Sequence, residues 1–231
     1  MEFDRIYAEV DLGRIEENME AMKEHLRPGT KMYGVVKTDA YGHGAVPVAR
    51  TIDRFVCGYA VATVDEGLKL RRHGIEKEIL SLGPVSAGRY QECLENDISL
   101  PVFEYRRAKE LSDAAAAEGK TAKIHIAVDT GMSRIGLFPD EGSVETVKEI
   151  AELPALRIAG MFTHFARADE ADKTNAGEQY SRFHAFCDAV KAAGVDVPVC
   201  HCSNSAGIVE LPDFNMDAVR ADHDLRPVPV G

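Results

Sequence analysis

A lysine stands in the segment VVKTDAYGHG, residues 35–44, directly after two valines and just before a glycine-rich turn. Valine runs are typical of strands, whereas Asp, Gly and His are typical of the loops that end them. We therefore expect Lys37 near the C-terminal end of a strand. A lysine there is either a solvated strand end or an amine that can form a Schiff base with a carbonyl compound.

Further polar residues lie at or just after other segments that have the composition of strands. They come from distant parts of the chain, and chance explains one such placement more easily than all of them. If the strands belong to one closed barrel, these side chains face a single cavity. They are Tyr41, Arg134, His164, Asn204, Ser205 and Arg220.

The types of these residues predict the kind of ligand. Asn204 and Ser205 open a helix in the segment SNSAG, where hydroxyl and backbone N–H donors can bind a phosphate as well as cap the helix. Arginines recognise carboxylates and phosphates, and the ring of His164 could stack on an aromatic ligand. A lysine, a phosphate site and a stacking ring together predict a site for pyridoxal phosphate (PLP).

The elements that would position these residues follow a regular order. Short apolar segments alternate with helical segments that have acidic or polar starts and glycine stops. Eight strands that alternate with helices predict an α/β fold, a (β/α)8 TIM barrel with its catalytic groups at the C-terminal strand ends. We also expect an amphipathic helix at 12–26 and a strand-like piece at 5–11 that the barrel does not need. The barrel strands are expected at 32–38, 57–63, 78–83, 98–103, 122–129, 156–165, 197–204 and 216–221.

The composition limits the class of protein and the kind of partner. The 231 residues are 45% hydrophobic, which is enough for one large domain. A net charge of −11 without a Lys/Arg cluster argues against a nucleic acid or an anionic membrane as partner and favours a small molecule. The sequence contains no apolar run of membrane-spanning length and no signal peptide, so we expect a cytoplasmic protein.

The five cysteines predict neither a disulfide framework nor a metal site, because they are scattered and form no Cys-x-x-Cys pair. The segment Cys200, His201 and Cys202 could suggest a metal. Alternation along a strand, however, puts both sulfurs on one face and the imidazole on the other. We therefore assign packing roles to these residues, to Tyr7, Tyr33 and Tyr59, and to the histidines other than His164.

The motifs also carry a family resemblance. The segments VVKTDAYGHG, VDTGMSRIGLFPDE, MFTHFARAD and CSNSAGIVELPDFNMDAVRA resemble, in this order and spacing, the N-terminal barrel domain of alanine racemases, which are fold-type III PLP enzymes. The resemblance covers about residues 3–221. It implies interconversion of L- and D-alanine, which supplies D-alanine for cell-wall peptidoglycan, with PLP as cofactor and alanine as substrate.

The resemblance also implies a role for each site residue. Lys37 would hold PLP covalently and remove the α-proton of D-alanine. Tyr41 and Ser205, beside Asn204, would bind the phosphate of the cofactor. His164 would pack on the pyridine ring, Arg134 would contact the PLP phenolate and the substrate, and Arg220 would face the pyridine nitrogen.

The sequence departs from the family pattern at two places. Many family members have a carbamylated lysine that braces the arginine at position 134, whereas this chain has Ala127. The family pattern after the last arginine is Arg-x-Gly-Ile-x-x-Tyr-Gly, whereas ADHDLRPVPVG follows Arg220 here. We expect a barrel at 1–221 and a tail at 222–231 that leads toward a C-terminal β domain not present in this sequence. In the family, that domain gives a tyrosine as the second acid/base across a homodimer.

Two other functions remain open at this point. A serine or broad-specificity amino-acid racemase, or a basic amino-acid decarboxylase, could use the same barrel. A non-catalytic PLP-binding barrel has about this length, although such proteins lack the Tyr-Gly-His-Gly continuation after their lysine.

Overall fold

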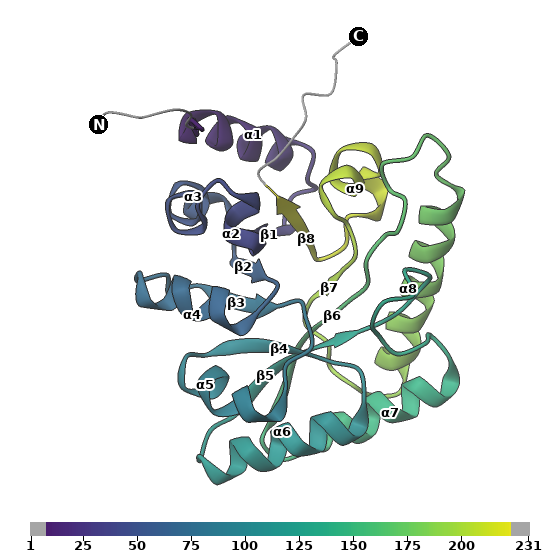
Figure 1. The fold of residues 1–231 in the computed structure, drawn as a ribbon. Helices are drawn as coiled ribbons and strands as arrows, with labels where there is room; N and C mark the ends of the chain where they lie inside the picture. The colour runs from purple at the N-terminus through teal and green to yellow at the C-terminus, as the bar shows by residue number, and fades with distance from the viewer. Residues whose placement is uncertain (1–7, 223–231) are drawn as a thin grey trace.

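The computed structural model describes residues 8–222, and its strands form a closed parallel barrel (Figure 1). Neighbouring strands follow the order of the sequence, and β8 pairs with β1, where Tyr33 lies opposite Arg220. The predicted (β/α)8 barrel is thereby confirmed. The strands are β1 (Lys31–Val35), β2 (Gly58–Val61), β3 (Glu78–Ser81), β4 (Ile98–Val102), β5 (Ala122–Ala127), β6 (Leu156–Phe162), β7 (Cys200–His201) and β8 (Ala218–Asp222).

Most strands end earlier than their apolar composition predicts. The ladder of β1 stops at Val35 rather than at residue 38, and that of β6 stops at Phe162 rather than at residue 165. Only two residues of the expected strand 197–204 are paired, in β7. Some of the residues that follow the ladders line the cavity at the C-terminal ends of the strands, among them Lys37, His164 and Asn204.

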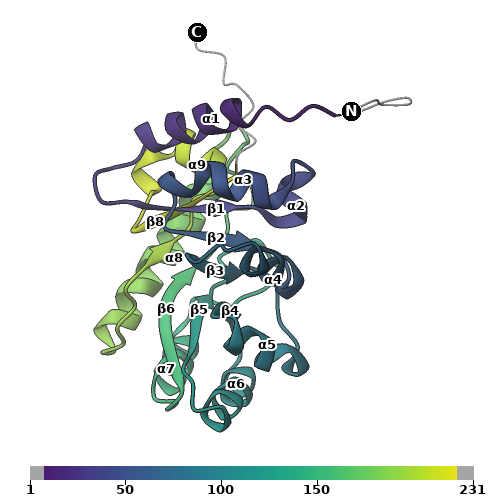
Figure 2. The ribbon, with the colours of Figure 1, turned by 90° about the vertical axis from the view of Figure 1, so that its left-hand side faces the viewer.

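Helices surround the barrel on its outer side (Figures 1 and 2). The helix expected at 12–26 spans Leu12–Glu24 and begins where Asp11 accepts hydrogen bonds from the N–H groups of Gly13 and Arg14. Residues 8–11 are not a strand, so that part of the expected piece at 5–11 was wrong, while 5–7 lie outside the described residues. The helices are α1 (Leu12–Glu24), α2 (Lys37–Tyr41), α3 (Ala45–Ile52), α4 (Val64–Arg72), α5 (Tyr90–Glu95), α6 (Tyr105–Ala117), α7 (Glu141–Ala151), α8 (Thr174–Ala192) and α9 (Ser205–Glu210).

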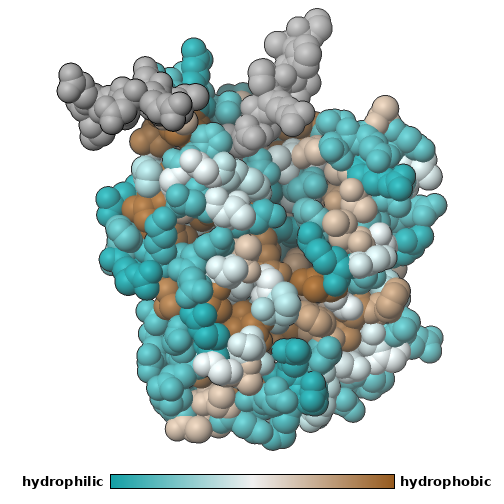
Figure 3. Space-filling view, in the orientation of Figure 1, coloured by the Kyte–Doolittle hydropathy of each residue, from teal (hydrophilic) through white to brown (hydrophobic). Residues whose placement is uncertain are grey.

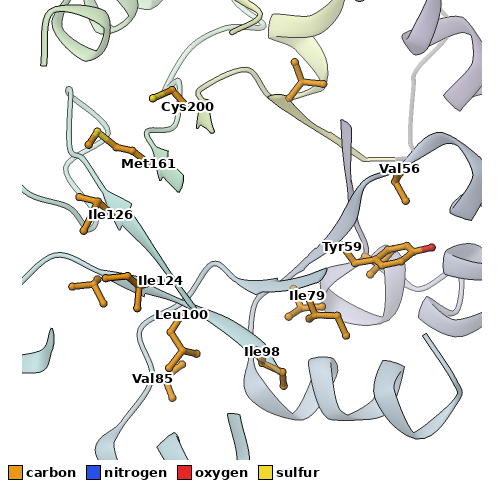
Figure 4. Packing of buried hydrophobic residues seen from close by; sticks show 14 of the residues in the cluster. Val56, Tyr59, Ile79, Val85, Ile98, Leu100, Ile124, Ile126, Met161 and Cys200 are labelled. Atoms are coloured by element: carbon orange, nitrogen blue, oxygen red, sulfur yellow. The ribbon is translucent and has the colours of Figure 1, made fainter. Parts of the chain in front are cut away.

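The main hydrophobic core lies between the strands and these helices. Figure 4 shows side chains such as Ile98, Ile124, Ile126 and Met161 in this layer, and all four are buried. Since side chains alternate along a strand, the residues between them point to the barrel interior. In the described part of the chain, no helix has the length and apolar character that a membrane span needs.

Candidate active site

A cavity of about 280 Å³ opens at the C-terminal ends of the strands. In the space-filling view, hydrophobic residues gather in the middle of the face that Figure 1 presents, and hydrophilic residues surround them (Figure 3). The walls come from the segments that follow β1, β2, β3, β5, β6 and β7, and from β8 itself. Among the residues chosen from the sequence, those that line the cavity are Lys37, Tyr41, Arg134, His164, Asn204 and Arg220.

Lys37 begins a turn of left-handed helix. The four residues that follow it, 38–41, have φ angles of 51°, 55°, 53° and 53°, although none is glycine. The left-handed helical conformation costs about 1 to 2 kcal/mol of free energy per non-glycine residue, so contacts with the surrounding structure must stabilise the turn. The amine of Lys37 lies 5.7 Å from the centre of the Tyr41 ring, within the distance of a cation–π contact.

Two carboxylates stabilise this left-handed turn. Glu66 on α4 accepts hydrogen bonds from the N–H groups of Thr38 (2.8 Å) and Ala62 (2.7 Å). Asp39 accepts from the N–H of Ala45 (2.9 Å) and from Lys69 (2.7 Å), and these two bonds lower the pKa of Asp39. The sequence analysis missed Glu66, although the capping box that it forms with Thr63 is a recognisable signal.

Arg220 is buried with its guanidinium fixed by acceptors. Nη1 donates to Nδ1 of His201 (2.6 Å), and Nη2 donates to the carbonyl oxygens of Thr163 (2.7 Å) and Cys202 (3.0 Å). The Arg220 guanidinium also lies 5.6 Å from the centre of the Phe162 ring. Burial lowers the pKa of Arg220 to about 10, so the group remains positively charged at neutral pH.

His164 is neutral at physiological pH. Burial, followed by the charges of Arg220, Arg134 and Lys37, lowers its pKa from 6.5 to about 3. Its Nδ1 lies 3.4 Å from Nη2 of Arg220. Because arginine can only donate, Nδ1 is the acceptor and the ring carries its proton on Nε2.

Arg134 lies in the loop after β5 and is exposed. The loop is shaped by Asp129, whose carboxylate accepts from the N–H groups of Gly131 (2.9 Å) and Ser133 (3.0 Å). Within residues 8–222, no hydrogen bond or ion pair holds the Arg134 guanidinium. Ala127 is buried at the end of β5 and offers only a methyl group.

Asn204 and Ser205 begin α9, as the sequence predicts. The Asn204 side chain caps the helix by accepting from the N–H of Gly207 at 3.0 Å. The Ser205 hydroxyl accepts from the N–H of Asp222 at 3.0 Å, and Ser205 itself does not line the cavity. Asp222 does line it, and the sequence analysis did not single out this residue.

Three residues assigned to packing take part in a polar network instead. His201 bonds to Arg220 and also to His125, with 3.1 Å between Nε2 of His201 and Nδ1 of His125. Tyr33 donates to Glu78 at 2.8 Å. Cys200 and Cys202 pack in the main hydrophobic core, whereas His201 bonds to His125 and Arg220. Tyr7 lies outside the described residues.

The fold and the position of the site place the protein among (β/α)8-barrel proteins whose polar groups gather at the C-terminal strand ends. Residues 10–221 match the model of the family described as the alanine racemase N-terminal domain. The chain belongs to this family.

Curated relatives and solved structures agree with this assignment. The chain is 38% identical to the alanine racemase of Clostridium tetani (strain Massachusetts / E88) and 44% identical to that of Clostridium novyi (strain NT), over 93% of this chain and 56% of each relative. The structure of the Clostridium difficile 630 alanine racemase superposes with a TM-score of 0.92 at 36% identity, and 95% of this chain covers 58% of that one. This chain therefore spans a little more than half the length of the proteins it matches.

Proposed function

We propose that this chain is the cofactor-binding barrel of a PLP-dependent alanine racemase and that Lys37 is its reactive amine. The observation that carries the proposal is the placement of Lys37 at a cavity together with a fixed, buried arginine. The relatives that the chain matches are named alanine racemases, and the chain is similar to more than half of their length.

The residues present fit the proposed cofactor. PLP is an aromatic aldehyde with a ring nitrogen, a phenolate and a phosphate, and the cavity offers an amine, cationic donors and a neutral imidazole. The N-terminus of α9 and the hydroxyl of Tyr41 are donors that suit the phosphate. We propose that Tyr41, Asn204 and Ser205 bind the phosphate, that His164 packs on the ring, and that Arg134 contacts the phenolate and the substrate.

When bound, PLP supplies the aldehyde that the amine attacks and an electron sink for the α-carbon of the substrate. The amine of Lys37 takes the α-proton of D-alanine and can return a proton to the same carbon. Arg220 only donates hydrogen bonds, so it leaves a ring nitrogen beside it largely unprotonated. The ring would then be a weaker electron sink. This disfavours the return of a proton to any position other than the α-carbon.

Racemisation needs a second acid/base on the opposite face of the α-carbon. We propose that a tyrosine from a β domain, which this 231-residue sequence does not include, supplies it across a homodimer. We further propose that residues 1–221 form the barrel and that 222–231 lead toward that domain, although 223–231 lie outside the described residues.

Visible absorbance tests whether Lys37 holds the cofactor. The chain incubated with PLP should show the visible band of lysine-bound pyridoxal phosphate, and Lys37→Ala should remove it. Lys31→Ala is the matched control, because Lys31 is exposed at the N-terminal end of β1, the strand that precedes Lys37. A band that survives in Lys37→Ala but not in Lys31→Ala would refute the assignment.

Exchange of the α-proton in deuterium oxide tests whether Lys37 serves only one face of the α-carbon. We expect the chain to exchange the α-proton of D-alanine without racemising it, because Lys37 serves one face only. Equal exchange of both enantiomers by the 231-residue chain would contradict the need for a second acid/base from elsewhere.

A further inference from the structure

A column of polar side chains crosses the interior of the barrel, where such folds ordinarily pack branched apolar residues. It runs from Arg220 near the cavity through His201 and His125 to Glu78, the first residue of β3. Because β3 begins at Glu78, this carboxylate lies at the end of the barrel opposite the cavity. The distances are 2.6 Å from Arg220 to His201, 3.1 Å from His201 to His125, and 3.3 Å from His125 to Glu78.

The chemistry of the two ends fixes the direction of every hydrogen bond between them. Arginine can only donate, so Nδ1 of His201 must accept and its proton must be on Nε2. That Nε2–H donates to Nδ1 of His125, which leaves the proton of His125 on Nε2. The Nε2–H of His125 then donates to Oε1 of Glu78, because an ionised carboxylate can only accept.

The state of Glu78 agrees with this direction. Burial raises the pKa of Glu78, but hydrogen bonds from His125, Ser99 and Tyr33 outweigh burial and lower it to about 2. At the middle of the column, burial and the charge of Arg220 lower the pKa of His201 well below its ordinary value. His201 can therefore be neutral beside the cationic Arg220.

The backbone makes room for this column. The pairing of β5 with β6 shifts by one residue, so that His125 lies opposite Gly160. A Cβ at Gly160 would approach the His125 ring to 2.7 Å. The ring of His201 is stacked between the rings of Tyr33 (5.4 Å between centroids) and Phe162 (5.4 Å), so it has little freedom to rotate.

We propose that Glu78 is a positioning residue for Arg220, acting across the barrel by fixing the tautomers of His125 and His201. A reversed tautomer of His201 would place an N–H against the guanidinium, and Nη1 of Arg220 would lose the imidazole as an acceptor. Glu78 therefore keeps the guanidinium in the orientation in which it can serve the ring of the cofactor. This role rests on the proposed function, because it matters to catalysis only if Arg220 faces PLP.

Nitrogen NMR of the histidine rings tests the tautomers directly in the 15N-labelled chain without PLP. The wild-type chain should carry the Nε2–H tautomer on both His125 and His201. A cationic His201, or one protonated on Nδ1, would overturn the proposal without any variant.

Variants of Glu78 test the action at a distance. Glu78→Leu removes the acceptor of His125. It should also change the ring signals of His201, which is two hydrogen bonds away from Glu78 along the column. Glu78→Gln should preserve them, since the amide oxygen still accepts from His125. Glu76→Leu is the matched control, because Glu76 is an exposed carboxylate two residues away. His201 signals that stay unchanged in Glu78→Leu would overturn the proposal.

Cofactor titration completes the test. The dissociation constant for PLP should rise about fivefold in Glu78→Leu and stay near the wild-type value in Glu78→Gln, as expected from one weakened hydrogen bond. Equal affinities in the wild type and Glu78→Leu would overturn the link to the cofactor. Failure of the wild-type chain to bind PLP would overturn the proposed function alone, because the NMR result is obtained without PLP.

Discussion

The two arginines of the cavity differ in how the protein holds them. Arg220 is buried, and its guanidinium donates to a histidine ring and to backbone carbonyls that are already in place. Arg134 is exposed on a loop whose own shape depends on Asp129, and within residues 8–222 its guanidinium has no hydrogen-bond or ion-pair partner. The first is oriented before any ligand arrives, whereas the second is free to move to one.

This difference follows from the elements that carry the two residues. Arg220 belongs to β8, a strand whose neighbours on both sides are fixed by closure of the barrel. Arg134 follows β5, where Ala127 gives no side chain long enough to brace it. We therefore expect substitutions at Arg220 to affect the fold and the cofactor together, and substitutions at Arg134 to affect ligand contacts alone.

The largest effect should come from Arg220→Ala. It leaves Nδ1 of His201 and the carbonyl oxygens of Thr163 and Cys202 without this donor, and each unsatisfied buried group costs about 1 to 3 kcal/mol. The free energy of unfolding should fall by about 3 kcal/mol or more, measured by urea denaturation. A loss below about 0.5 kcal/mol would remove the contrast with Arg134.

Gly160→Ala should have the next largest effect. The new Cβ would lie 2.7 Å from the His125 ring and 2.8 Å from the carbonyl oxygen of Val199. Overpacking of this kind costs about 1 to 3 kcal/mol in unfolding free energy. Gly177→Ala is the control, since its nearest atom is 3.9 Å away and alanine favours a helix. Equal stability of both variants would argue that the column tolerates displacement.

Acid should weaken the column through Glu78. Its pKa is lowered from 4.5 to about 2 in the folded chain, so its stabilising contribution is present above pH 4.5 and is lost as the pH falls toward 2. The stability difference between wild type and Glu78→Gln should therefore shrink over this range, because glutamine does not titrate. Urea denaturation at several pH values measures it, and a difference that grows on acidification would contradict the assignment.

The smallest effect on stability should come from Arg134→Ala. An exposed residue without a partner in the described chain should change the unfolding free energy by less than about 0.5 kcal/mol. Exchange of the α-proton of D-alanine should nevertheless require a higher substrate concentration, because Arg134 is proposed to contact the substrate. Arg134→Lys tests geometry against charge, and full recovery by lysine would mean that charge alone suffices.

The barrel and most of its cavity could be predicted from the sequence, because alternating strands and helices dictate where the C-terminal strand ends meet. Lys37 and Arg220 are examples, since each stands at the end of an apolar run. The ends of the strands were less predictable. Val36 continues the apolar pattern of β1, yet the ladder already ends at Val35.

The polar column could not be predicted in this way. His125 and His201 alternate with apolar residues, which is also the pattern of residues that merely pack. Their partners come from different strands, and a one-residue shift in the pairing of β5 with β6 sets His125 opposite Gly160. The left-handed turn at residues 38–41 could not be predicted either, because none of these residues is a glycine, which would have indicated a positive φ.

The turn that carries Lys37 has a consequence for how the chain folds. A left-handed helical turn cannot nucleate on its own, since the left-handed conformation is energetically unfavourable for each of its residues. It becomes stable only when α4 supplies Glu66 and Lys69 from the next βα unit. We therefore expect the amine to reach its working position late, after the first two units have docked, so that an incompletely folded chain does not present a preformed reactive centre.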